Sequence, residues 1–178
     1  MADEHDQPDL TQAQRDALCL SGGSHDQAAG ASHAMLLFLD FDGVLHPAFC
    51  KARDYFCHMP LFAAAMREHP EVSIVISSTW RHFYPLEELR KAFPADIAAR
   101  VIGMTPEADG QMRHVEITQY LEQHAPPGAP WVALDDNHFS FPDHCANLVA
   151  CDGNVGLSAE AIEKLRGLIR QLKTPGMP

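Results

Sequence analysis

The chain has 178 residues, and 24 Asp and Glu residues against 13 Lys and Arg residues give it a formal net charge of −11. This length suits one domain, which can bury most of the surface that the unfolded chain would expose. A negative charge of this size repels a polyanion at long range, so it argues against extended, nonspecific binding of nucleic acid.

Residues 1–33 are rich in Gly, Ser, Ala, Gln and acidic residues and have little apolar periodicity. This composition predicts a flexible N-terminal extension ahead of a folded domain at residues 34–174. The sequence has no basic start followed by an apolar run and no run long enough to cross a bilayer, so we expect a cytoplasmic protein without a membrane partner. The five cysteines form no Cys-x-x-Cys pair, which argues against a zinc site and a disulfide scaffold.

Residues 36–47 read LLFLDFDGVLHP, an apolar run followed by two carboxylates. Such a run is typical of a strand that is covered on both faces, so Asp40 should emerge at the carboxyl edge of a parallel sheet. Asp40 and Asp42 repel each other unless a cation or a shared proton intervenes, and oxygen ligands suit Mg²⁺. Gly43 permits a turn that directs both acids into one space, whereas His46 either contacts substrate or packs under that turn. The simpler interpretation is a solvated Asp-Gly turn after a core strand.

Residues 71–80 read EVSIVISSTW, an apolar strand that ends in hydroxyl residues. A hydroxyl at a strand end can donate a hydrogen bond to a phosphoryl oxygen. If the strand covers residues 72–77, Ser78 is that donor, and a shift of one residue makes it Ser77. The alternative use of both residues is to cap the next helix.

Two arginines are candidates for a cation that holds an anionic substrate. Arg113 lies in QMRHVEITQYLEQH, whose apolar stripe predicts a helix near residues 112–124 with this arginine in its first turn. Arg81 follows the hydroxyl residues directly. Most surface arginines are solvated or form ion pairs worth roughly 0–1 kcal/mol, so the positions near strand ends are what single these two out.

Residues 131–136 read WVALDD, a short buried strand that ends in two acids. Asp135 and Asp136 are further candidate metal ligands, and Asn137 offers another oxygen. Adjacent side chains on an extended backbone point to opposite sides. Only one of the two aspartates should therefore face the metal, unless the chain turns between them.

Strands and helices alternate along the rest of the chain. We predict strands at 35–39, 72–77, near 100–103, 131–134 and 147–151, and helices near 60–68, 85–93 and 112–124, with a last helix that begins at the N-cap Ser158. Such alternation is typical of an α/β, three-layer Rossmann-like fold with a central, mainly parallel five-stranded sheet.

Three strands that end in acids or hydroxyls, in this order, resemble the haloacid dehalogenase (HAD) superfamily. Residues 40–45 match its motif Asp-x-Asp-Gly-(Val/Thr)-(Leu/Ile) without a departure. The resemblance implies a Mg²⁺-dependent phosphomonoester hydrolase in which Asp40 becomes an aspartyl-phosphate and Asp42 is the general acid and base. The implied phosphate-binding residues are Ser78 or Ser77 and Arg113 or Arg81, and the implied metal ligands are Asp40, Asp42, Asp135 and Asp136.

The sequences DFDGVLHP, SSTWR and WVALDD resemble in particular the small HAD domains of bacterial RNA-repair proteins. Residues 46–58 and 105–111 leave room only for loops or a minimal flap, so no large cap domain is expected. An uncapped site admits a small phosphate ester or an accessible phosphate on a macromolecule. The alternatives to a general phosphatase are a phosphatase of nucleic-acid ends and a non-catalytic or regulatory domain that binds metal and phosphate.

Overall fold

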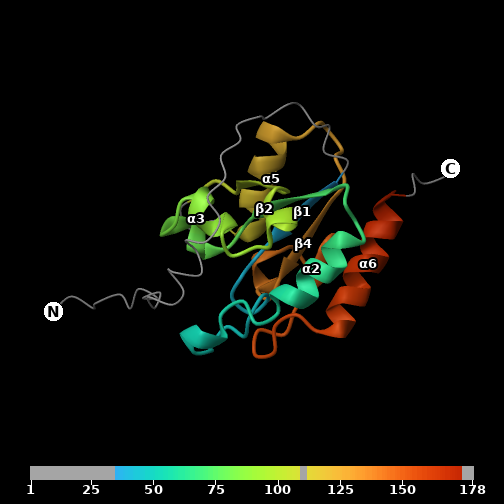
Figure 1. The fold of residues 1–178 in the computed structure, drawn as a ribbon. Coiled ribbons are helices and arrows are strands. Elements are labelled where there is room, and N and C mark those ends of the chain that lie inside the picture. The colour runs from blue at the N-terminus through green and yellow to red at the C-terminus, as the bar shows by residue number, and fades with distance from the viewer. Residues whose placement is uncertain (1–34, 109–111, 174–178) are drawn as a thin grey trace.

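The computed structural model describes residues 35–108 and 112–173, and within them one five-stranded sheet has the order β3-β2-β1-β4-β5 (Figure 1). The strands are β1 (Met35–Leu39), β2 (Val72–Ile76), β3 (Val101–Met104), β4 (Trp131–Asp135) and β5 (Leu148–Ala150). The α-helices are α2 (Met59–Arg67), α3 (Leu86–Arg90), α4 (Ala95–Ala98), α5 (Arg113–His124) and α6 (Ala159–Lys173). Short 3₁₀ helices are η1 (Ala52–Asp54), η2 (Thr79–His82) and η3 (His138–Ser140). All four strand pairings are parallel, which confirms the predicted α/β architecture.

The sheet lies between two helical layers, which is why every residue of β1 is buried. Leu37 and Leu39 belong to the larger core cluster, which also holds residues of α2, α4 and α6. Leu36 and Phe38 point to the opposite face, where they pack with Ile117 and other residues of α5. Figure 1 shows α2 and α6 together on one side of the sheet and α5 on the other.

The register of the three central strands brings their carboxyl ends to one level. Leu39 of β1 pairs with Ile76 of β2 and with Leu134 of β4. The amide of Asp40 then donates to the carbonyl of Leu134 at 3.0 Å, and the amide of Ser77 donates to the carbonyl of Leu39 at 2.9 Å. The residues that follow these strands therefore meet at one edge of the sheet, as parallel α/β folds require of their sites.

The helix predicted near residues 85–93 is wrong in extent, because the structure has the short helix α3 followed by a second helix, α4, that the sequence did not predict. Pro94 lies between them, and a proline disfavours helical geometry at the residue before it. The predicted start of the last helix is confirmed, since the Ser158 hydroxyl accepts a hydrogen bond from the amide of Ala161 at 3.1 Å.

No large cap domain interrupts the described part of the chain. The connection between β1 and α2 contains only η1, and the described residues between β3 and α5 form no element. Residues 35–108 and 112–173 also contain no helix long and apolar enough to span a membrane. The predicted extension at residues 1–33 lies outside the described residues, and the domain limits 34–174 stay a prediction.

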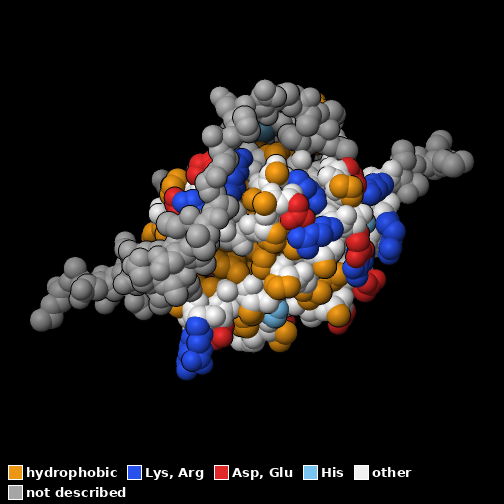
Figure 2. Space-filling model, viewed as in Figure 1, with side chains coloured by type: hydrophobic (Ala, Val, Ile, Leu, Met, Phe, Trp, Pro, Cys, Tyr) orange, Lys and Arg blue, Asp and Glu red, His pale blue; other side chains and the backbone are white. Residues whose placement is uncertain are grey.

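Charged side chains of the outer helices are largely paired with each other. Arg166 of α6 pairs with Glu163 at 2.5 Å and with Glu68, and Lys164 pairs with Glu160 at 2.8 Å. Figure 2 shows Lys and Arg side chains beside Asp and Glu along this edge of the molecule. Exposed pairs of this kind contribute only about 0–1 kcal/mol each, so they indicate a solvated surface.

Candidate active site

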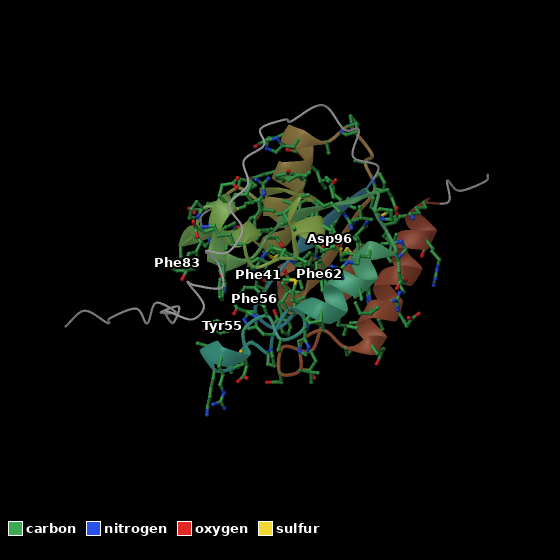
Figure 3. All side chains as sticks on the ribbon, in the orientation of Figure 1. Phe41, Tyr55, Phe56, Phe62, Phe83 and Asp96 are labelled. Carbon is green, nitrogen blue, oxygen red and sulfur yellow. The ribbon has the colours of Figure 1, made fainter. Side chains whose placement is uncertain are left out.

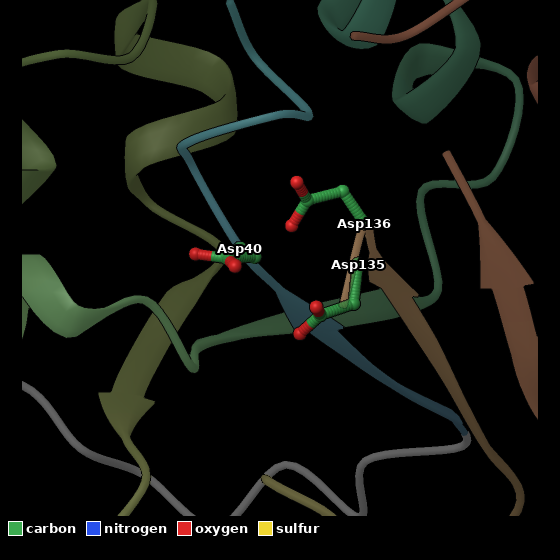
Figure 4. A group of neighbouring side chains, drawn as sticks. All are labelled: Asp40, Asp135 and Asp136. Carbon is green, nitrogen blue, oxygen red and sulfur yellow. The ribbon is translucent and has the colours of Figure 1, made fainter. Parts of the chain in front are cut away.

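Three carboxylates converge at the carboxyl edge of β1 and β4. Asp40, Asp135 and Asp136 each place one carboxylate oxygen within 4.8 Å of the others, and Figure 4 shows the three side chains turned toward a common space. We call these residues the acidic group. The chain bends directly after β4, where the amide of Asn137 donates to Asp135 Oδ1 at 2.9 Å. Because of this bend both adjacent aspartates belong to the group, an arrangement that the sequence had left open.

Burial makes the acidic group electrostatically unfavourable in its fully ionised form. Burial is the largest cause that raises the pKa of Asp40, and the Arg113 charge opposes it. Burial and the charge of Asp40 raise the pKa of Asp135 to about 7. Burial also raises the pKa of Asp136. Carboxylates in such surroundings favour binding either a proton or a cation.

The acidic group fits a divalent cation such as Mg²⁺. Its donor set consists of carboxylate oxygens alone, which hard cations prefer. Asp135 Oδ2 is buried and has no hydrogen-bond partner among the described residues. A Cβ atom at Gly43 would lie 2.1 Å from Asp136 Oδ2, and one at Gly153 would lie 2.4 Å from it. Two glycines thus provide the space that the Asp136 carboxylate occupies.

Arg113 adds a positive charge to the acidic group. It is the first residue of α5, as the sequence predicted. Its Nη2 lies 3.5 Å from Asp40 Oδ2, and its Nη1 lies 3.6 Å from Asp135 Oδ2. Nη1 makes no hydrogen bond within the described part of the chain. The guanidinium therefore keeps donor capacity for a further anion.

Arg81, the other candidate cation, has a different environment. Its Nη1 donates to the backbone carbonyls of Ser77 at 2.9 Å and Ser78 at 2.8 Å. Its Nη2 pairs with Glu116 Oε1 at 2.6 Å, and both side chains are buried. Glu116 also lies 3.9 Å from Arg113 Nε through its other oxygen. Arg81 thus holds the turn after β2, and Glu116 connects the two arginines.

Hydroxyl residues follow β2 and β3, and the Ser78 side chain reaches Asp40. The strand β2 ends at Ile76, so Ser77 and Ser78 both lie beyond it. A hydrogen bond from Ser78 lowers the pKa of Asp40, and the Ser78 hydroxyl accepts from the amide of Trp80 at 3.4 Å. The hydroxyls of Ser77 and Thr105 are buried and have no hydrogen-bond partner within residues 35–108 and 112–173.

Sequence reasoning missed two of these polar residues. Thr105 follows β3, and its amide donates to the carbonyl of Ile76 at 2.9 Å, next to the two serines. A hydroxyl residue directly after an apolar strand was the signal that could have found it. Glu116 is an acid three positions after Arg113 on a helix, a spacing that places the two side chains on one face.

Asp42 lies outside the acidic group, although the sequence had placed it among the metal ligands. Its Oδ1 lies 3.0 Å from His46 Nε2, and its Oδ2 accepts a hydrogen bond from Trp80 Nε1 at 2.9 Å. The four predicted carboxylates are thus divided in the structure, with three in one group and Asp42 beside the ring nitrogens of His46 and Trp80. His46 is fully buried under the turn.

An uncapped all-parallel sheet, with Asp-x-Asp-Gly after its central strand and two aspartates after the neighbouring strand, defines a hydrolase domain of the HAD type. The family described as the HAD domain in Swiss Army Knife RNA repair proteins matches residues 36–162, well over half of the chain, and the chain belongs to this family. The resemblance that the sequence motifs indicated is thereby confirmed. Comparison with curated proteins and with solved structures found no match to this chain.

Proposed function

We propose that the protein is a Mg²⁺-dependent phosphomonoester hydrolase that works through an aspartyl-phosphate on Asp40. The observation that carries this proposal is the acidic group itself, with two buried carboxylates and one half-buried carboxylate at two strand ends and one guanidinium beside them. Three negative charges against one positive charge leave a deficit that a divalent cation neutralises. Buried charges that serve stability alone are usually balanced by their partners.

The first half of the reaction uses Asp40 and Asp42 in different roles. A carboxylate oxygen of Asp40 attacks phosphorus, the bond from phosphorus to the ester oxygen breaks, and Asp42 gives its proton to that oxygen. Arg113 and Ser78 donate hydrogen bonds to the phosphoryl oxygens, where negative charge spreads in the transition state. We choose Ser78 over Ser77 because the Ser78 hydroxyl contacts Asp40. Mg²⁺, held by the acidic group, would supply charge neutralisation for the nucleophile and the phosphoryl group.

The second half restores the enzyme. A water molecule attacks phosphorus of the aspartyl-phosphate, and Asp42, which gave up its proton in the first half, takes one from this water. The bond from phosphorus to Asp40 breaks, inorganic phosphate leaves, and Asp40 is a carboxylate again. One residue thus acts first as an acid and then as a base.

The test is the variant Asp40→Asn, assayed with an aryl phosphate in the presence of Mg²⁺. Asparagine cannot form the aspartyl-phosphate, so turnover should fall on the order of a thousandfold or more. Circular dichroism and thermal melting show whether the fold is kept. The exposed residue Asp143 offers a matched control, since Asp143→Asn removes a carboxylate that does not belong to the acidic group. Full turnover by Asp40→Asn would refute the mechanism.

The alternative of a non-catalytic or regulatory domain predicts a different result from the same wild-type assay. Such a domain would bind Mg²⁺ and phosphate at the acidic group and Arg113 without turnover. Absence of Mg²⁺-stimulated phosphate release from nucleotides, sugar phosphates, phosphopeptides and phosphorylated oligonucleotides would favour it over the phosphatase.

A phosphatase of nucleic-acid ends is the second candidate function. The matching family is described by its occurrence in RNA repair proteins, and no cap closes the described site. Phe49 is 95% exposed on the loop after β1, and Phe139 is 81% exposed in η3 after β4, so two aromatic rings follow the strands that carry the acidic group. Exposed rings of this kind stack on unpaired bases. With a net charge of −11, a single docked end suits the protein better than extended contact.

Comparison of a phosphorylated oligonucleotide with the matching mononucleotide tests this candidate. Stacking on Phe49 or Phe139 should raise kcat/KM for the oligonucleotide, and alanine substitution of either should lower it by about five- to a hundredfold per stacked base. Activity toward the aryl phosphate should stay constant in these variants. Equal kcat/KM values for oligonucleotide and mononucleotide would contradict the preference for ends.

A further inference from the structure

Asp42 is held by two nitrogen donors from different parts of the chain. His46 Nε2 lies 3.0 Å from one carboxylate oxygen, and Trp80 Nε1 donates to the other at 2.9 Å. Trp80 is 38 positions away in the sequence and belongs to η2, after β2. Each oxygen of this carboxylate therefore has its own N–H donor.

The backbone around His46 determines which of its nitrogens carries the proton. The amide of Phe56 donates to His46 Nδ1 at 3.4 Å, so this nitrogen acts as the acceptor. The proton of the neutral ring is then on Nε2, which points at Asp42. Phe56 has a positive φ of 59°, a geometry that costs a non-glycine residue about 1–2 kcal/mol.

Aromatic neighbours keep both donor rings in place. The ring centroid of His46 lies 4.9 Å from that of Tyr55, 5.4 Å from that of Phe56 and 6.0 Å from that of Trp80. Phe41 lies against Trp80 with centroids 5.8 Å apart. We call these five residues the aromatic cluster, and Figure 3 shows Phe41, Tyr55 and Phe56 close together in it. Rings packed on several sides lose rotational freedom, so the donors are oriented before any substrate arrives.

The carboxylate that these buried rings hold is itself accessible. The side chain of Asp42 is 39% exposed, whereas His46 is fully buried and Trp80 is 6% exposed. The indole of Trp80 carries no charge, so its N–H group orients the carboxylate without cancelling its charge, unlike the guanidinium beside Asp40. A group that must give up and regain a proton needs such an orientation.

We propose that His46 and Trp80 are positioning residues that aim Asp42 for proton transfer to and from the phosphorylated substrate. This inference rests on the phosphatase function proposed above. The competing explanation is structural, since Asp42 also satisfies two buried donors that would otherwise lack acceptors. The two explanations differ in how a substitution acts on esters with good and poor leaving groups.

The decisive variant is Trp80→Phe, which keeps an aromatic ring and removes the N–H group. An alkyl phosphate needs a proton on its leaving oxygen, whereas the nitrophenolate of p-nitrophenyl phosphate leaves without one. We expect kcat/KM to fall by about ten- to a hundredfold for the alkyl ester and by less than about threefold for the nitrophenyl ester. The ratio kcat/KM reports only the steps through release of the alcohol, so it isolates the acid role of Asp42.

His46 supports the test independently. The amide nitrogen of His46→Gln reaches about as far as Nε2 and can donate to Asp42, whereas His46→Leu has no donor. We expect His46→Gln to keep the wild-type ratio between the two esters and His46→Leu to change it as Trp80→Phe does. The two His46 variants therefore test the positioning of Asp42 even if Trp80→Phe does not fold.

Equal losses for both esters in the folded variants would overturn the positioning role and leave the phosphatase function intact. Absence of turnover by the wild-type protein on either ester would overturn the phosphatase function and this inference together. A burst of nitrophenol before the steady state in Trp80→Phe would support the positioning role further, because slower hydrolysis makes the aspartyl-phosphate accumulate.

Discussion

Asp40 and Asp42 are two positions apart and have opposite surroundings. Asp40 lies in the acidic group, next to two carboxylates and the guanidinium of Arg113. Asp42 lies against the aromatic cluster, where His46 Nε2 lies 3.0 Å from one of its oxygens and Trp80 Nε1 donates to the other. In the proposed mechanism this difference gives the two carboxylates their two roles, since charge acts on Asp40 and orientation acts on Asp42. Changes of charge should therefore act mainly through the acidic group, while the charge of Asp42 has a smaller effect in raising the pKa of Asp40 and of Asp136.

Removal of the metal is the strongest way to test this division. In wild-type protein, Mg²⁺ at about a hundred times its dissociation constant should raise the melting temperature by about 5–10 °C, and chelation should abolish turnover. The variant Asp136→Asn removes one ligand from the acidic group. Its melting temperature should therefore no longer rise with Mg²⁺, and its turnover should fall about a thousandfold. Thermal melts with and without Mg²⁺ give the measurement.

The variant Asp42→Asn is the matched comparison for that experiment. It leaves the acidic group complete, so Mg²⁺ should still raise its melting temperature by nearly the wild-type amount, while its turnover of alkyl phosphates falls. If Mg²⁺ no longer raised the melting temperature of Asp42→Asn, Asp42 would take part in metal binding, and the proposed separation of Asp40 and Asp42 would be wrong.

The two arginines provide the next test. Arg81→Met leaves the buried carboxylate of Glu116 without its closest partner and should destabilise the protein by about 3–5 kcal/mol. Arg113→Met removes a donor aimed at Asp40, and in saturating Mg²⁺ it should lower kcat about a hundredfold with a smaller loss of stability. Denaturant unfolding and steady-state kinetics of both variants give the comparison. A stable Arg81→Met protein with weakened phosphate binding would reverse the two assignments.

Gly43 and Gly128 make a third and smaller comparison. Both residues have a positive φ, +66° and +77°, so alanine costs each of them about 1–2 kcal/mol of backbone strain. A Cβ at Gly128 would meet nothing within 4 Å, whereas one at Gly43 would overlap the Asp136 carboxylate. We expect Gly43→Ala to weaken Mg²⁺ binding and Gly128→Ala to leave it unchanged, as titration calorimetry can measure. Equal Mg²⁺ affinity in both variants would show that the Asp136 carboxylate does not need this space.

Local patterns predicted the fold and the position of the acidic group. The apolar runs before Asp40 and Asp135 are long enough to specify strands, and parallel strands bring their carboxyl ends together by geometry alone. Helix α6 was predictable because Ser158 caps a clear apolar stripe. These features depend on neighbours in the sequence or on the general rules of a parallel sheet.

Side-chain orientation was less predictable, because it depends on contacts between distant segments. The direction of Asp42 follows from Trp80, and nothing in the sequence around the turn indicates that contact. The sequence left both Arg113 and Arg81 as candidate cations, and contacts between distant segments distinguish them. Arg113 lies beside Asp40, whereas Arg81 pairs closely with the buried Glu116. The orientation of Asp135 and Asp136 was ambiguous until the bend at Asp136, directly after β4, was known.

The pH dependence of stability again separates the two carboxylate environments. Burial and the Asp40 charge raise the pKa of Asp135 to about 7 in the folded protein, from an ordinary value of 3.8. Between these values the folded state binds more protons than the unfolded state, so the free energy of unfolding of metal-free protein should fall as pH rises toward 7. Asp135→Asn removes this contribution.

In the presence of a chelator, the melting temperature of Asp135→Asn minus that of wild type should therefore rise by several degrees between pH 4 and about pH 7. Above pH 7 this difference should change little. The difference between the two melting curves isolates this group from the other titrating residues. Saturating Mg²⁺ should flatten the wild-type curve, because the cation takes the place of the proton in the acidic group. An unchanged difference across the whole pH range would mean that Asp135 is ionised without the metal, and the electrostatic reason for a cation at this edge of the sheet would be lost.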